Sequence, residues 1–155
     1  MSTTADTSHA EARPTIRAAR LGDRERVFAL LKQLAASYAP DRDTFDESFA
    51  FLLEDDATSV LLVAEDATGL VTGYALTTIT PLLYTNGKSA QLQELVVDNH
   101  ARGNGVGTAL IEEIEAVCRS RSVKQLTVAS RRSADFYERL GYRSTADFLK
   151  RTFDD

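Results

Sequence analysis

A glycine-rich segment, residues 102–108 (RGNGVGT), lies between a predicted strand and a predicted amphipathic helix. Its alternating glycines let the backbone approach a ligand closely. The N-terminus of the following helix presents unpaired N–H groups and the positive end of the helix dipole. Together these features predict an anion site, and phosphate or pyrophosphate is the anion that suits such a backbone cradle best.

The two commonest phosphate loops do not match this segment. A Walker A loop requires Gly-Lys followed by Ser or Thr, and a dinucleotide fingerprint that begins at Gly103 requires glycine where Thr108 stands. Nucleotide or nicotinamide binding is therefore disfavoured. A glycine-rich turn between a strand and a helix also occurs without any ligand, so the loop alone leaves a bound phosphate and a plain tight turn as alternatives.

The elements that must position this loop alternate between strand and helix periodicity in a mixed order, without an internal repeat. A hairpin turn is expected at residues 66–69, and Gly73 indicates a bulge or a close backbone approach. The predicted strands are 15–19, 59–65, 70–79, 88–98 and 124–129, with two closing strands over 142–153.

Four helices are predicted between these strands. The first follows an N-cap at Asp23 and stops before Pro40, and the second opens with a capping box from Thr44 to Glu47. The third follows the glycine-rich loop and carries an apolar face that includes Cys118. The fourth spans residues 133–140 and ends at Gly141.

Three segments occur in an order and spacing typical of one family: QELVVD at 93–98, RGNGVG at 102–107 and ADFYERLGY at 134–142. The second matches the pattern [Gln/Arg]-x-x-Gly-x-[Gly/Ala], and the third contains Phe-Tyr-x-x-x-Gly-[Phe/Tyr]. In tandem they resemble the GNAT superfamily of N-acetyltransferases. The order of elements from residue 15 to residue 153 agrees with this likeness.

The resemblance implies a single α/β (α+β) domain over residues 15–155, preceded by a flexible tail at residues 1–14. Its central sheet would be mixed, mostly antiparallel, with about six to seven strands flanked by about four helices. It also implies acetyl-CoA as cosubstrate, bound in a V-shaped opening between two central strands, with its pyrophosphate on the 102–108 segment. The implied CoA contacts are Val96, Val97, Arg102, Gly103, Asn104, Gly105, Val106, Gly107, Thr108 and Ser130.

Ser130 departs from the family pattern, because many members carry Asn there to bind the CoA arm. Tyr137 falls at the position of the family's general acid, which protonates the leaving thiolate. A phenol is a weaker acid than a thiol by about 2 kcal/mol in water, so hydrogen bonding to the thiolate is the minimum role. The alternative for Tyr137 is a core aromatic whose hydroxyl makes one structural hydrogen bond.

Glu94 is the candidate general base. An alkylamine is only about 0.04% neutral at pH 7, so its attack on a thioester benefits from a group that removes a proton. In the family an acidic residue at this strand position often serves, usually through water. The alternative is that Glu94 pairs with a neighbouring strand or faces solvent. Tyr84 and its loop are a candidate lid over the acceptor site.

Composition restricts the class of protein. The 155 residues carry a formal charge of −5 and are 43% apolar, which excludes a disordered chain and a dedicated nucleic-acid binder. One cysteine and two histidines suggest neither a disulfide framework nor a metal site. No membrane-spanning run or targeting segment is present, so a cytoplasmic location is expected.

The function that fits best is N-acetyl transfer from acetyl-CoA to a primary amine, a cationic small molecule or peptide amine, by direct attack through a tetrahedral intermediate. The alternative is a catalytically silent acyl-CoA-binding or sensor domain, which would need neither Tyr137 nor Glu94. The residues select no particular acceptor. They leave the oligomeric state open as well, although such folds often form homodimers.

The net charge hides two opposed regions. Residues 41–56 hold seven acidic residues and one basic residue, whereas residues 119–151 hold nine basic and three acidic residues. In the fold that the chain resembles, the first region borders the acceptor and the second lies near the CoA phosphates. A cationic acceptor and an anionic cosubstrate are therefore expected to be attracted to different sides, with both attractions weaker at high salt.

Overall fold

The computed structural model describes residues 13–35, 39–130 and 133–153, which form one five-stranded sheet in the order β1-β2-β3-β4-β5. The first three pairings are antiparallel, and β4 and β5 are parallel. The strands are β1 (Thr15–Ala18), β2 (Ser59–Glu65), β3 (Val71–Leu82), β4 (Gly87–Val97) and β5 (Gln125–Val128). The α-helices are α1 (Arg24–Leu34), α2 (Arg42–Glu54), α3 (Val106–Ser120) and α4 (Ala134–Arg139). Short 3₁₀ turns are η1 (Leu21–Asp23) and η2 (Asn99–Ala101).

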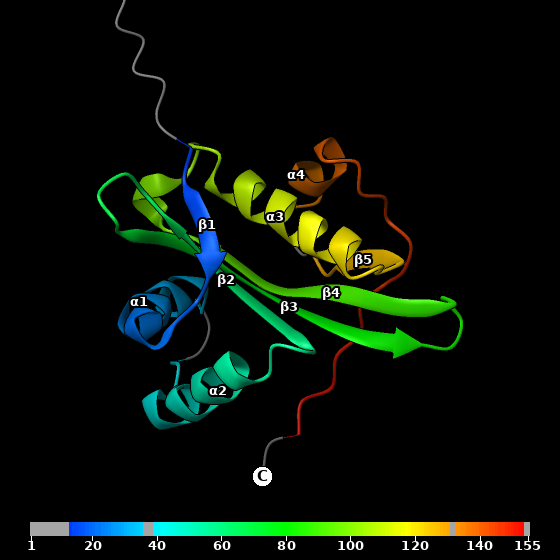
Figure 1. Ribbon diagram of the computed structural model, residues 1–155, viewed down its shortest axis with the longest axis horizontal. Helices are drawn as coiled ribbons and strands as arrows, with labels where there is room; N and C mark the ends of the chain where they lie inside the picture. The colour runs from blue at the N-terminus through cyan, green and yellow to red at the C-terminus, as the bar shows by residue number, and fades with distance from the viewer. Residues whose placement is uncertain (1–12, 36–38, 131–132, 154–155) are drawn as a thin grey trace, which may run out of the picture.

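The helices cover both faces of the sheet, with α1 and α2 on one side and α3 and α4 on the other (Figure 1). Each side has its own apolar core. The α3-face cluster contains Val60, Leu62, Ala64, Ala75, Ile79, Ala90, Leu92, Val106, Leu110, Ile111, Ile114, Cys118 and Tyr137. The α1–α2-face cluster contains Val27, Leu30, Phe49, Leu61, Val63, Val71, Tyr74 and Val96.

Helix α3 shows why the sequence folds this way. Leu110, Ile111, Ile114 and Cys118 recur at helical spacing and are at most 7% exposed, so they form one buried stripe against the sheet. Burying each large aliphatic side chain contributes about 1.5–3 kcal/mol. Gly73 of β3 lies beneath this helix, and a Cβ there would be 3.0 Å from a Val106 methyl carbon. The close approach expected at Gly73 is confirmed.

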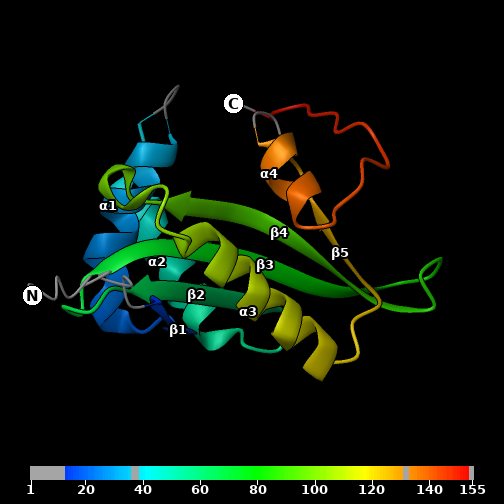
Figure 2. The same cartoon turned by 90° about the horizontal axis from the view of Figure 1, so that it is seen from above.

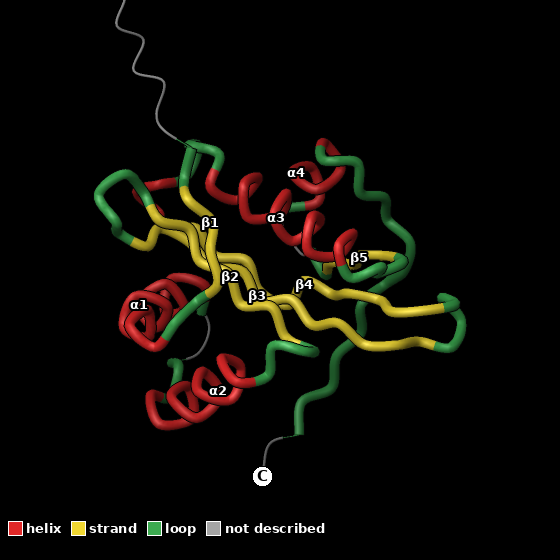
Figure 3. Tube along the Cα trace, in the orientation of Figure 1, coloured by secondary structure: helices red, strands yellow, loops and turns green. Residues whose placement is uncertain are grey.

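Two expected local features are wrong. Helix α2 begins two residues before Thr44, because Asp41 is its N-cap and accepts a hydrogen bond from the Thr44 N–H at 2.9 Å. Residues 142–153 form no strand within the part of the chain that the structure describes; Figure 3 shows them as loop. Five strands are present, not six to seven, because this segment pairs with neither edge strand of the sheet, β1 or β5. The mixed, mostly antiparallel sheet with four α-helices is confirmed.

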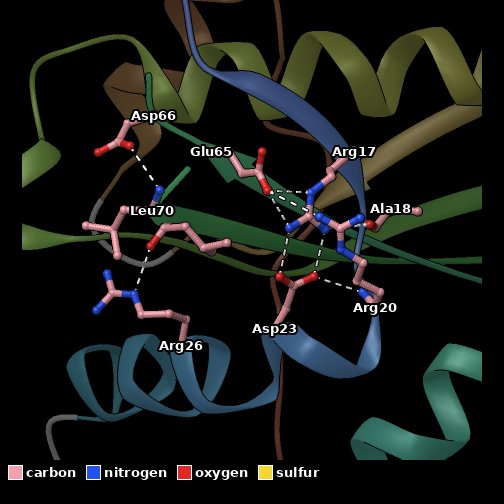
Figure 4. A network of polar contacts seen from close by, with 9 residues as sticks. Arg17, Ala18, Arg20, Asp23, Arg26, Glu65, Asp66 and Leu70 are labelled. Carbon is pink, nitrogen blue, oxygen red and sulfur yellow. Dashed lines mark hydrogen bonds and ion pairs between the residues drawn. The ribbon is translucent and has the colours of Figure 1, made fainter. Parts of the chain in front are cut away.

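A polar network fixes β1 against η1 and β2 (Figure 4). The Arg17 guanidinium donates two hydrogen bonds to the Asp23 carboxylate, at 2.7 and 2.8 Å, and its Nε donates to Glu65 at 2.8 Å. Asp23 is the N-cap residue of α1, as predicted, but its side chain makes no cap bond and accepts from the Arg20 N–H instead. The Arg17 guanidinium holds the pKa of the buried Asp23 carboxyl below its ordinary value.

Replacing Arg17 with methionine is expected to lower the free energy of unfolding by about 2–3 kcal/mol at pH 7, because Asp23 then keeps a buried charge without its partner. The folded-state pKa of Asp23 is lowered, so this contribution is present above the unfolded pKa and is lost as the pH falls through the folded one. Urea unfolding at several pH values measures the loss. Arg20→Met, at an exposed side chain, is the control, and equal losses in the two variants would contradict the prediction.

No helix in the described part of the chain is long and apolar enough to cross a membrane. The tail expected at residues 1–14 lies outside the described residues except for Arg13 and Pro14, and Arg13 pairs with Glu112 of α3 at 3.1 Å.

Candidate functional site

Strand β5 pairs with β4 over only part of β4. The parallel pairing runs from Ser89 with Gln125 to Leu92 with Val128, where β5 ends. Beyond that point β4 runs on to Val97, whereas the chain after β5 turns away from it into α4 (Figure 2). The last residues of β4, up to Val97, therefore have a strand on one side only, which opens the sheet between its two parallel strands.

A β-bulge marks the point of divergence. Leu76 pairs with Glu94 and the next residue of β3 pairs with Leu92, so Gln93 has no opposite residue. Leu92 belongs to the α3-face cluster, whereas Val96 belongs to the α1–α2-face cluster. Residues four apart on a regular strand share a face, so the bulge reverses the alternation. It places Glu94 on the α1–α2 side.

On that side Glu94 borders a groove. Two adjoining cavities, of about 520 and 450 Å³, are both lined by Ser48, Leu52, Leu76 and Glu94. We call them together the α2 groove. Each lies within the volume range typical of small-molecule sites. The Tyr74 hydroxyl donates a hydrogen bond to Glu94 Oε1 at 2.8 Å and orients the carboxylate beside the groove.

The glycine-rich loop has the geometry of an open cradle. Gly103 and Gly105 adopt φ angles of +86° and +78°, which side chains rarely adopt, and a Cβ on either would meet nothing within 4 Å. The first hydrogen bond of α3 runs from the Ala109 N–H to the Gly105 carbonyl at 3.0 Å. The N–H groups of residues 106–108 come before this first helical hydrogen bond, so they have no acceptor within the helix and are presented at its N-terminus. The residues present therefore fit a pyrophosphate group.

Three elements converge at this helix start. A Cβ added to Gly107 would lie 3.5 Å from the Phe136 ring of α4 and 3.7 Å from a Val97 methyl carbon of β4. Val97 packs against the α3-face cluster, and Val96 is buried on the opposite face. The structure thus brings the loop, the open end of β4 and the start of α4 together. Arg102 and Asn104 are exposed in the loop.

Tyr137 is buried in the α3-face cluster, and its ring meets those of Phe136 and Tyr142 edge-on at 5.0 and 5.9 Å. Burial raises the pKa of its hydroxyl. The neighbouring Tyr142 hydroxyl donates to Glu115, whereas the Tyr137 hydroxyl has no hydrogen-bond partner among the described residues. Tyr137 and Glu94 therefore lie on opposite sides of the sheet, and the opening between β4 and β5 separates them.

Two candidate residues from the sequence, Ser130 and Tyr84, remain to be located. Ser130 follows the last β4–β5 pair by two residues, and its hydroxyl accepts a hydrogen bond from the Ser133 N–H at 3.1 Å. Tyr84 is exposed at the tip of the β3–β4 hairpin and lines neither cavity of the α2 groove. The interpretation of Tyr84 as part of an acceptor lid receives no support from its position.

Sequence reasoning missed a polar anchor at the end of β4. The buried Asp98 carboxylate accepts hydrogen bonds from Arg26 at 3.1 Å, from Gln33 at 3.3 Å and from the His100 N–H at 2.9 Å. The His100 N–H and the Arg26 guanidinium keep the pKa of Asp98 below its ordinary value. Asp98 thereby ties α1 to the start of the glycine-rich loop.

The groove residues were missed too, because α2 and β3 meet only in the folded chain. The one available signal was the hairpin pairing, which sets Leu76 opposite Glu94. Within the described residues no group of three or more His, Cys, Asp or Glu side chains could hold a metal ion.

Solved structures with similar folds cover nearly the whole chain. One is a transcriptional regulator from Bacillus halodurans C-125, with a TM-score of 0.80, 24% identity and coverage of 90% of this chain and 99% of the other. Another is glucosamine-6-phosphate N-acetyltransferase from Arabidopsis thaliana, with a TM-score of 0.79, 24% identity and coverage of 91% and 99%. At this identity the likeness establishes the fold.

Sequence comparison identifies a relative and a family as well as a fold. The chain is 35% identical over 79 residues to a glucosamine 6-phosphate N-acetyltransferase of Trypanosoma brucei brucei; the match covers 50% of this chain and about half, 54%, of that relative. Residues 57–144 match the acetyltransferase (GNAT) domain family, a span that includes the bulge, the glycine-rich loop and α4. The chain therefore belongs to the GNAT acetyltransferase family.

Proposed function

We propose that this protein is an N-acetyltransferase that moves the acetyl group of acetyl-CoA to a primary amine by direct attack. The observation that carries the proposal is the opening of the sheet beyond Leu92, which has the glycine-rich cradle at one end and Glu94 on the opposite face. The two substrates can then approach the same stretch of β4 from different sides.

The cosubstrate is proposed to bind along the open edge of β4. The CoA pyrophosphate would accept hydrogen bonds from the backbone of residues 102–108, at the positive end of the α3 dipole. Val96 and Val97 would contact the pantetheine arm, and Ser130 would contact it from the β5 side. Acetyl-CoA supplies the activated acyl group as a thioester.

The proton balance assigns one role to each titratable side chain. The amine arrives as an ammonium ion and gives a proton to Glu94, directly or through water. Its neutral nitrogen then forms a bond to the thioester carbonyl carbon and gives a tetrahedral intermediate. As the bond from that carbon to sulfur breaks, the nitrogen loses its second proton through water to the departing thiolate or to solvent, and the amide and CoA are formed. The Tyr137 hydroxyl donates a hydrogen bond to the departing thiolate. Because burial raises the pKa of Tyr137, a strong hydrogen bond is favoured over complete proton transfer.

A CoA-release assay over a panel of primary amines tests the proposal, with glucosamine 6-phosphate included because the trypanosomal relative is named for that acceptor. The double variant Glu94→Gln/Tyr137→Phe is the control. Release of CoA that depends on both the amine and the intact residues supports the proposal. CoA binding without turnover on any amine would favour the silent acyl-CoA-binding domain, and stabilisation by NAD with none by CoA would overturn both.

The cradle yields its own prediction. Gly105→Ala is expected to raise the Kd of CoA about tenfold, because a positive φ costs an L-residue about 1–2 kcal/mol and the new methyl group projects into the open cradle. Isothermal titration with CoA measures the change. Gly22→Ala is the matched control, since Gly22 has ordinary φ and open surroundings in η1. An unchanged Kd in the Gly105 variant would contradict the assigned pyrophosphate site.

A homodimer is the proposed assembly, with neither nucleic acid nor a membrane as a partner, and the proposed location is cytoplasmic. Phe148, Leu149 and Phe153 are 72%, 90% and 90% exposed in the segment that forms no strand. Clustered apolar side chains at a surface mark protein contact sites, and a second copy would cover them. Sedimentation should give a dimer for the parent and a monomer for Phe148→Ser/Leu149→Ser.

A further inference from the structure

The α2 groove is built mainly from apolar side chains. Leu31 of α1, Phe45 and Leu52 of α2 and Leu76 of β3 lie along it, and the ring of Phe51, 65% exposed, borders its smaller cavity. Such a surface is covered most favourably by an apolar ligand, because both surfaces then leave water. A sugar ring would instead bury hydroxyl groups against side chains that cannot bind them.

The charged residues of the groove all have one sign. Its carboxylates are Asp41 and Glu47 at the α2 wall and Glu94 from β4, and the described residues that line it include no Lys or Arg. A cation would be attracted to these groups, whereas a phosphate would be repelled and would find no partner for its charge. The groove thus combines apolar walls with negative charge.

We propose that the acceptor is a primary amine carried on an apolar body, aromatic or branched aliphatic, and not a sugar phosphate. This inference rests on the proposed function and names its substrate class.

Three acceptors that share a primary amine as the reactive group test the proposal: phenethylamine, spermidine and glucosamine 6-phosphate. Phenethylamine has the apolar body, spermidine has only added positive charge, and the sugar phosphate has the opposite charge. Measured with saturating acetyl-CoA, kcat/KM for phenethylamine should exceed that for glucosamine 6-phosphate by about 100-fold and that for spermidine by about tenfold.

Two variants connect this preference to the groove. Phe51→Ser and Leu52→Gln should each raise KM for phenethylamine about tenfold with little change in kcat, because they remove apolar contact made equally in the ground and transition states. The KM for spermidine, which has no ring or branch to pack against these side chains, should rise less than that for phenethylamine. Phe51 is exposed, so its variant folds even if the half-buried Leu52 variant does not. Leu83→Ser, at a fully exposed side chain of the β3–β4 hairpin, is the control.

The outcomes separate the substrate class from the activity. Turnover with glucosamine 6-phosphate or spermidine as the best acceptor overturns the inference and leaves the proposed acetyl transfer standing. If no amine is acetylated, titration of phenethylamine into the CoA-loaded protein decides the matter. Binding that Phe51→Ser weakens supports the groove's specificity while the proposed activity fails, and absence of binding overturns both.

Discussion

Tyr137→Phe is expected to lower kcat by about 10²- to 10³-fold, the range for loss of one hydrogen bond to negative charge that develops in the transition state. The Kd of CoA should stay constant. Stability should also be unaffected, because the hydroxyl that is removed has no hydrogen-bond partner among the described residues, so its loss leaves no donor or acceptor unsatisfied. The variant would therefore separate catalysis from folding.

A matched control lies in the same aromatic cluster. The Tyr142 hydroxyl donates to Glu115 of α3 at 3.2 Å, so Tyr142→Phe removes a phenol with a structural hydrogen bond. This variant should lose about 1 kcal/mol of stability and keep its kcat. Single-turnover acetylation and thermal unfolding of both proteins give the comparison. A Tyr137 variant that turns over like the parent would show that the hydroxyl has no part in the reaction.

Glu94→Gln is expected to lower kcat/KM by at least about 100-fold at pH 7, because the bound ammonium ion then loses its proton acceptor. Glutamine keeps an oxygen that can accept the hydrogen bond from Tyr74, so the groove should retain its shape. The deficit should shrink toward pH 9. Over that interval the neutral fraction of an alkylamine rises about 100-fold, and the base becomes less important.

The pH profile also distinguishes a base from a simple electrostatic attraction. If Glu94 only attracted the cation, added salt would weaken binding in the parent, and the deficit of the variant would stay constant between pH 7 and 9, because about 95% or more of the amine remains protonated over that interval. Glu113→Gln, an exposed carboxylate on the outer surface of α3, is the control for removing one negative charge. A pH-independent deficit would overturn the assignment of Glu94 as the base.

Sequence patterns predicted the parts of this fold that depend on local periodicity. Strand β2 has the predicted bounds, and the apolar stripe of α3 is the one that the spacing of its residues indicated. The turn at Gly141 ends α4 as expected, with the Tyr142 N–H donating to the Tyr137 carbonyl at 3.0 Å. These features depend on residues close together in the chain.

The failures have a different physical origin. Asp41 and Thr44 are both good N-cap residues, and only the folded geometry shows which one caps α2. Residues 142–153 have the composition of strands, but a strand also needs an edge to pair with, and composition does not reveal one. The α2 groove depends on contacts between α1, α2 and β3, which no local pattern describes.

The bulge at Gln93 lets two residues that are two apart in β4 serve opposite faces of the sheet. Leu92 lies in the α3-face core and Glu94 borders the α2 groove, although regular alternation would place both on one face. Deleting Gln93 would leave Leu92 and Glu94 adjacent and still opposite Thr77 and Leu76, so both side chains would keep their faces and the strand would become regular. In natural or designed relatives, a one-residue gap at this point of β4 is therefore no ground to expect loss of activity.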